Sequence, residues 1–201
     1  MEQTFLSATI LLILITDPLG NIPPLLGILK GVEPARRTRI ILRECAIALF
    51  VLLVFLLFGR QILGVLHLSE DTLRIAGGVV LFLIALNMIF PGAGARIVEP
   101  GEGGEPFIVP IAIPLVSGPS AMVTVMLIAG SDPSRMLEWV GAVVITIATS
   151  AVAFLLANRM QKVLGNHVIA AMERLMGLVL TAISIDMLLK GFESYLRGVL
   201  G

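Results

Sequence analysis

Six long apolar stretches follow one another along the chain, separated by connections rich in proline, glycine or charge. A transmembrane helix needs about 20 predominantly apolar residues. Each stretch is long enough, and the second, with the uncharged run CAIALFVLLVFLLFG, is the most continuous. The longest connection, residues 92–106, separates two groups of three stretches. The pattern therefore predicts six membrane spans, at residues 5–29, 42–66, 72–91, 107–130, 138–158 and 170–190.

The first and fourth predicted spans are interrupted by residues that disrupt helices. The first contains DPLGNIPPLL and the fourth contains IPLVSGPSA. Proline removes a backbone donor and clashes with the preceding turn, whereas glycine gives the chain freedom to turn. We therefore expect residues 17–23 and 114–120 to leave the helix. Unwound backbone is tolerated at membrane depth only where protein buries it or water reaches it, so both breaks should face the interior of the bundle.

The two halves of the chain resemble one another at a nearly constant spacing. The motif Pro-Leu-x-x-x-Pro at 18–23 recurs 96 residues later, at 114–119. The segment LGVLHLSEDTLRIAGGVV parallels LGNHVIAAMERLMGLVL, with His, Arg, Gly and Val repeated 100 residues apart. Because each half holds an odd number of spans, the second half enters the membrane from the opposite side. The sequence predicts an all-α fold in one transmembrane domain (1–201), made of two inverted three-helix repeats at 5–91 and 107–190.

Composition agrees with a membrane protein. Of the 201 residues 57% are hydrophobic and 14% are charged, against about 25% charged in soluble domains, and the mean hydropathy is +1.02. Lys plus Arg equals Asp plus Glu, at 14 each, so no basic excess points to nucleic acid. The chain carries no HExxH, GxSxG or P-loop motif. We therefore expect no enzyme activity, no cofactor and no metal site.

The distribution of Lys and Arg predicts the orientation in the membrane. Cytoplasmic connections carry an excess of these residues. With both termini outside, nine of the 14 fall in cytoplasmic segments, five of them in residues 30–43. The acid at Glu2 and the lack of a small-residue cleavage site argue against a signal peptide. The expected location is a bacterial or archaeal cytoplasmic (inner) membrane, crossed several times.

The two breaks supply the candidate binding chemistry. New helix N-termini after Pro23 and Pro119 offer unpaired N–H groups to a carboxylate. Exposed carbonyl groups and the Asp17 carboxylate suit an ammonium group or a cation. The combination fits a small zwitterion. The candidate substrate-binding residues are Asp17, Pro18, Gly20, Asn21, Pro23, Pro114, Ser117, Gly118, Pro119, Ser120 and Thr124.

Plainer interpretations stand beside each of these assignments. A transmembrane proline often only kinks a helix, and Asp17 could instead cap the second half-helix. Asp186 is a second intramembrane acid, and with Asp17 it is a candidate coupling residue. It lies four residues before Lys190, so an i,i+4 ion pair is equally consistent. Arg43 and Glu44 are expected at the membrane edge, and the paired glycines near 77 and 177 predict close helix packing.

The motifs resemble those of a known family. DPLGNIPPLL, EPFIVPIAIPLVSGPSA and ERLMGLVL are similar to segments of the MarC family of bacterial and archaeal inner-membrane proteins, particularly its YhgN-like branch. The resemblance covers nearly the whole chain. Some members of that family are described as transporters of small neutral amino acids such as glycine and alanine, and the resemblance implies that activity here.

The sequence therefore favours a secondary transporter of small neutral amino acids that works by alternating access around the two breaks. Coupling to H⁺ or Na⁺ is expected, because no nucleotide-binding segment is present. A channel or passive exporter of small solutes or ions is the alternative, and a membrane scaffold without transport is a third possibility. The sequence predicts the lipid bilayer as partner and leaves the oligomeric state open.

Overall fold

The chain folds as a bundle of helices. The computed structural model describes residues 4–90 and 111–200, and within these ranges every regular element is helical. The predicted linker 92–106 and the start of the predicted fourth span, 107–110, lie outside the described residues. The elements are α1 (Phe5–Thr16), α2 (Ile22–Ile28), η1 (Leu29–Gly31), α3 (Pro34–Val65), α4 (Glu70–Ile89), η2 (Ile111–Val116), α5 (Pro119–Ser131), η3 (Pro133–Arg135) and α6 (Met136–Leu200).

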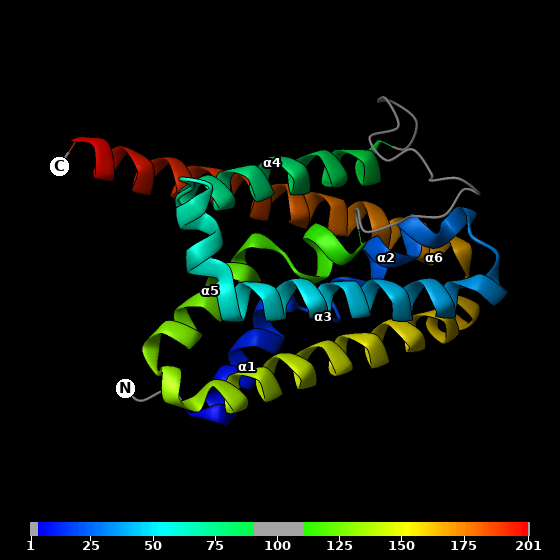
Figure 1. The fold of residues 1–201 in the computed structure, drawn as a ribbon. Coiled ribbons are helices and arrows are strands. Elements are labelled where there is room, and N and C mark those ends of the chain that lie inside the picture. Colours follow the sequence, from blue (N-terminus) through cyan, green and yellow to red (C-terminus); the bar gives the residue numbers. More distant parts are fainter. Residues whose placement is uncertain (1–3, 91–110, 201) are drawn as a thin grey trace.

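Four helical stretches in the described residues are long and apolar enough to cross a membrane: Pro34–Val65, Asp71–Ile89, Pro133–Ala157 and Ala170–Arg197. The third begins in η3 and continues into α6, and the fourth lies wholly in α6. α6 runs to one end of the molecule and returns along α4 (Figure 1). α1 and α5 are apolar but shorter, with 12 and 13 residues. At 1.5 Å per residue each is about 20 Å long, less than the roughly 30 Å hydrocarbon core.

Local features of the sequence set both ends of α1 and separate it from α2. Thr4 and Ser7 form a capping box that begins the helix. Asp17 then adopts left-handed backbone (φ 38°, ψ 66°), and Pro18 cannot continue the helix. α2 resumes at Ile22 with prolines in its first turn, where a missing N–H costs nothing. The break therefore covers residues 17–21, and Pro23, predicted to be unwound, belongs to α2.

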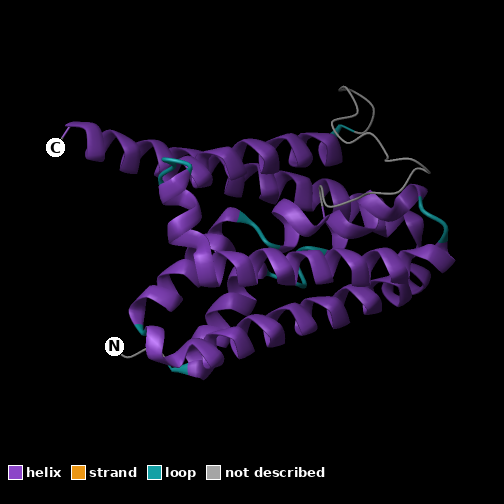
Figure 2. Ribbon diagram, viewed as in Figure 1, coloured by secondary structure: helices purple, strands orange, loops and turns teal. Residues whose placement is uncertain are grey.

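The second break has a similar cause. Ile113 has extended backbone (φ −129°, ψ 128°) beside Pro114, which interrupts η2. α5 begins at Pro119, again a proline in a first turn. Figure 2 shows loop segments at both breaks among the helices of the bundle. Leu19 of the first break is 73% exposed, whereas Ser117 of the second break is fully buried. The predicted interruptions at both Pro-Leu-x-x-x-Pro motifs are present.

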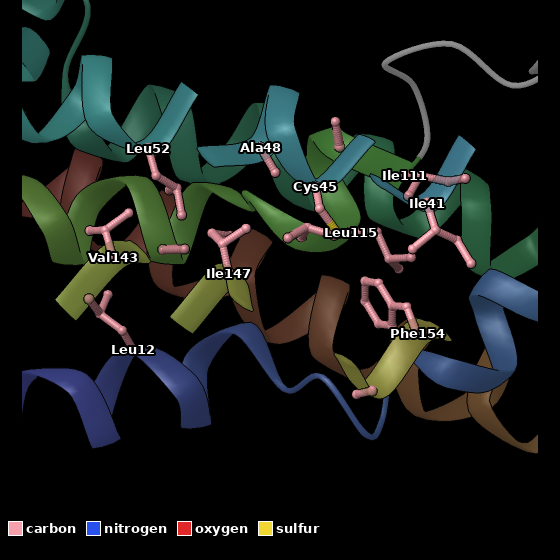
Figure 3. Close-up of a cluster of buried hydrophobic side chains, with 14 of the residues drawn as sticks. Leu12, Ile41, Cys45, Ala48, Leu52, Ile111, Leu115, Val143, Ile147 and Phe154 are labelled. Atoms are coloured by element: carbon pink, nitrogen blue, oxygen red, sulfur yellow. The ribbon is translucent and has the colours of Figure 1, made fainter. Parts of the chain in front are cut away.

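The main core lies between the first half of α6, α3, α1 and η2. Buried positions of α3 recur every three or four residues, which places them on one face of that helix. Leu12, Cys45 and Phe154 all belong to the buried cluster drawn in Figure 3, which surrounds the interrupted helix that carries Leu115. This packing encloses the second break within protein.

Two predicted connections are helical in the structure. Residues 30–43 are expected to form a polar loop, but α3 begins at Pro34 and includes four of the arginines. Arg36 and Arg39 are exposed on this helix, whereas Arg37 is buried and donates from Nε to the Val32 carbonyl at 3.0 Å. The expected connection 159–169 is likewise helical backbone within α6. The high charge density of these two segments predicted loops, but in the structure α3 and α6 extend through them.

Candidate functional site

Asp17 holds the first break in shape. Its backbone N–H still donates to the Ile13 carbonyl at 3.0 Å, so it closes α1 as the C-cap residue. Its carboxylate Oδ1 accepts from the Gly20 N–H at 3.0 Å. A Cβ on Gly20 would collide with the same carboxylate. Asp17 therefore does not cap α2, whose N-cap residue is Asn21, and its side chain is exposed beside the break.

Asn21 joins the two breaks. It is 8% exposed, and its Nδ2 donates to the Thr16 carbonyl at 2.7 Å and to the Leu115 carbonyl at 3.0 Å. Both carbonyls belong to interrupted helices, and both residues are buried. Asn21 thus satisfies backbone acceptors of both motifs with one amide group.

The second break is stabilised from within. Ser117 is fully buried, and both its N–H (2.9 Å) and its Oγ (2.7 Å) donate to the Ala112 carbonyl. A Cβ on Gly118 would press on the Pro114 carbonyl oxygen, so the turn requires glycine there. Thr124 Oγ1 donates to the Ser120 carbonyl inside α5 at 2.7 Å. The hydroxyl groups of Ser117 and Thr124 therefore donate to backbone carbonyls of their own break or helix.

A cavity of about 130 Å³ lies between the two breaks. It is partly open, and its wall is mainly apolar with a few polar groups. The lining residues are Ile15, Thr16, Asp17, Gly20, Asn21, Gly77, Leu81, Pro114, Leu115, Val116, Gly118, Pro119, Ser120, Ala121, Met176, Val179, Leu180, Ile183 and Met187.

The cavity brings together most of the residues singled out from the sequence. Those that line it are Asp17, Gly20, Asn21, Pro114, Gly118, Pro119 and Ser120. Pro18, Pro23, Ser117 and Thr124 belong to the same two segments but do not line it. The structure does not bring Asp186 to the cavity. Its carboxylate is exposed and pairs with Lys190 at 2.8 Å, the i,i+4 alternative considered above.

Two helices that sequence reasoning did not assign to the site complete its wall. Gly77 of α4 lies against the ring of Pro119, so close that a Cβ would overlap it. The second half of α6 contributes Met176, Leu180, Ile183 and Met187. These four follow a helical spacing of three or four residues, so one face of α6 points at the breaks. The predicted close packing at Gly77 and Gly177 is present: Gly177 lies against Ala85 and Met88 of α4.

Glu44, expected at the membrane edge, is buried inside the bundle. Its side chain is 0% exposed, and it lies on the buried face of α3 with Ile40, Ile41 and Ala48. The spacing along the sequence indicates this burial, because positions 37, 41, 44, 48 and 52 share one helix face. Among the described residues, no group of three His, Cys, Asp or Glu could hold a metal ion.

Several long apolar helices, with interrupted helices inside the bundle, define a multi-pass α-helical membrane protein. The chain belongs to the MarC family of integral membrane proteins, whose family pattern matches residues 2–196. It is 45% identical over 193 residues to the UPF0056 inner membrane protein YhgN of Escherichia coli (strain K12), covering 96% of this chain and 98% of that one. It is a protein of the inner membrane.

More distant relatives match over a similar extent. A UPF0056 membrane protein of Buchnera aphidicola subsp. Baizongia pistaciae is 44% identical over 195 residues, covering 96% of this chain and 98% of its own. A UPF0056 membrane protein of Pyrococcus abyssi is 31% identical over 194 residues, covering 95% of each chain. No solved structure matches this chain.

Proposed function

We propose that this protein is a secondary transporter of small neutral amino acids rather than an enzyme. In this proposal the chain crosses the membrane six times, as two inverted three-span repeats with both termini outside. α1 with α2, and η2 with α5, each form one interrupted span. In support, both termini lie at the same end of the molecule (Figure 1), as an even number of crossings requires.

The observation that carries the proposal is the cavity between the two breaks. Corresponding interrupted helices in the two halves of a transporter commonly hold its substrate. The volume of about 130 Å³ is well below the roughly 300–1,000 Å³ of pockets for drug-sized ligands. It has room for several water molecules or for one solute of a few non-hydrogen atoms. Size therefore favours glycine or alanine over a large substrate.

The polar groups at the cavity suit the two charges of an amino acid. The Asp17 carboxylate has an oxygen beyond the one that accepts from Gly20, and it can accept from an ammonium group. At the other break, α5 begins with Pro119, and the N–H groups of Ser120 and Ala121 have no acceptor within the helix. These N–H groups and the positive end of the helix dipole suit a carboxylate.

The hydrogen bond from Asn21 to the Leu115 carbonyl connects the two repeats directly at the breaks. Alternating access moves one repeat against the other around a fixed site. Asn21 and the Leu115 carbonyl come from opposite halves and lie at the cavity wall. In our proposal they keep the two breaks in register while the outer parts of the helices move.

Asp17→Asn is expected to weaken glycine binding about tenfold or more, since a hydrogen bond to a charged partner contributes about 1.5–3 kcal/mol. The fold should persist because Asn Oδ1 can still accept from the Gly20 N–H. Titration calorimetry with purified protein measures the affinity. Asp132→Asn is the matched control: Asp132 Oδ1 accepts from the Ser134 N–H at 3.1 Å, but it does not line the cavity. Equal affinity of Asp17→Asn and the parent protein would make the carboxylate purely structural.

A further inference from the structure

Glu44 is a carboxylate enclosed by apolar packing. It is 0% exposed, and its Oε1 accepts from Arg43 Nε at 3.0 Å and lies 2.9 Å from Arg43 Nη2. Its Oε2 is also buried and has no hydrogen-bond partner among the described residues. Buried polar atoms are nearly always paired, and an exception asks for an explanation. None of the contacts described for the proposed substrate cavity involves Glu44.

The other acids of the apolar helices have different surroundings. Asp17 is exposed, and its carboxylate accepts from a backbone N–H. Asp186 is exposed and pairs with Lys190. Burying a carboxylate oxygen that lacks a hydrogen-bond donor is costly while the group is ionised. Glu44 is therefore the acid in the described spans that has a buried oxygen without a partner among the described residues.

Among the described side chains, the charged and titratable groups next to Glu44 come from its own helix. Arg43 contacts Oε1, and Cys45 is the next residue on the buried face. α3 packs against η2, α5 and α6. Neither η2 nor α5 contains a titratable residue. Of the described side chains in the first span of α6, Glu138 is the acid, and it pairs with Arg135 at the start of that helix.

This environment suits a proton better than a metal cation. A metal ion needs several oxygen ligands at once, but the buried neighbours of Glu44 on α3 are Ile40, Ile41, Cys45 and Ala48. A proton needs a single oxygen. Arg43 has a side chain 32% exposed, and its guanidinium, which contacts Oε1 at 2.9 Å, can balance the carboxylate charge when the proton is gone.

We propose that Glu44 is the proton-carrying carboxylate of this protein. A proton from water adds to Oε2 and makes the enclosed group neutral. It returns to water on the other side when the repeats rearrange, and Arg43 then neutralises the carboxylate. No bond other than O–H forms or breaks. The role of this proton in driving accumulation rests on the proposed transport function, whereas proton binding at Glu44 does not.

Infrared spectroscopy tests proton binding without any substrate. Wild-type protein in lipid nanodiscs, titrated with acid, should show a carboxylic-acid C=O band at the high frequency typical of an apolar environment. Glu44→Gln should lack that band, while Glu193→Gln, which removes an exposed acid paired with Arg197, should retain it. Identical bands in the wild type and Glu44→Gln would overturn the assignment.

Transport in proteoliposomes tests the coupling. Glu44→Gln should lose accumulation of labelled glycine driven by a pH gradient, and Glu44→Asp should restore part of it. A Glu44→Gln protein that accumulates glycine like the wild type would overturn the coupling role and leave the transport function standing. If the wild type itself transports none of the small neutral amino acids, the proposed function fails, and the infrared result alone decides whether Glu44 carries a proton.

Discussion

Asn21→Ala is expected to have the largest effect on stability of any substitution at the site. It removes the donor that serves the Thr16 and Leu115 carbonyls. Each buried acceptor left without a partner costs about 1–3 kcal/mol, so we expect a loss of roughly 2–6 kcal/mol in the free energy of unfolding. Transport should be lost as well, because the hydrogen bond that connects the two breaks is removed. Unfolding in a denaturing detergent measures the first effect.

Asn87→Ala is the control for this substitution. Asn87 is an exposed asparagine in the last turns of α4, outside the cavity. Its replacement should change the free energy of unfolding by no more than about 0.5 kcal/mol. If Asn21→Ala and Asn87→Ala have the same small effect, the bond between the two breaks does not support the site.

Gly77→Ala is expected to disrupt the cavity from the side of α4. The new Cβ would overlap the Pro119 ring, which is rigid and begins α5. The helices must separate or the ring must shift. Overpacking of this kind costs about 1–3 kcal/mol. Because Gly77 and Pro119 both line the cavity, we expect weaker glycine binding together with a lower melting temperature.

Gly64→Ala separates this steric effect from helix propensity. Gly64 also lies in a helix, but a Cβ there would meet nothing within 4 Å. Alanine favours a helix over glycine by about 1 kcal/mol, so Gly64→Ala should leave the protein as stable as before or slightly more so. A Gly77→Ala protein that also gains stability and binds glycine normally would show that α4 does not set the wall of the cavity.

The two breaks could be predicted from the sequence because their cause is local. Proline and glycine act on their own turns, so Pro18, Pro114 and Pro119 mark interruptions wherever the helices pack. Repetition of the motif then predicted that both interruptions share one site. The cavity between them is lined by residues of both breaks. The length of each break was less certain: Pro23 fits the first turn of α2.

The remaining wall depends on packing between distant helices. Gly77 was recognised as a position of close approach, but its contact with Pro119 requires the three-dimensional arrangement. Ser117 looked like a ligand by type, although its hydroxyl bonds back to Ala112. Glu44 follows Arg43 in a charged segment, and its burial inside the bundle depends on the phase of α3, which packs against η2, α5 and α6.

Counterflow in proteoliposomes tests the central claim most directly. Vesicles containing the purified protein are loaded with unlabelled glycine or alanine and diluted into a trace of the labelled amino acid. A transporter with an alternating site exchanges the two, so the label should accumulate transiently inside and saturate with concentration. Asn21→Ala vesicles should show none. Label that only equilibrates, without transient accumulation, or an absence of uptake across a panel of small neutral amino acids, would contradict the account.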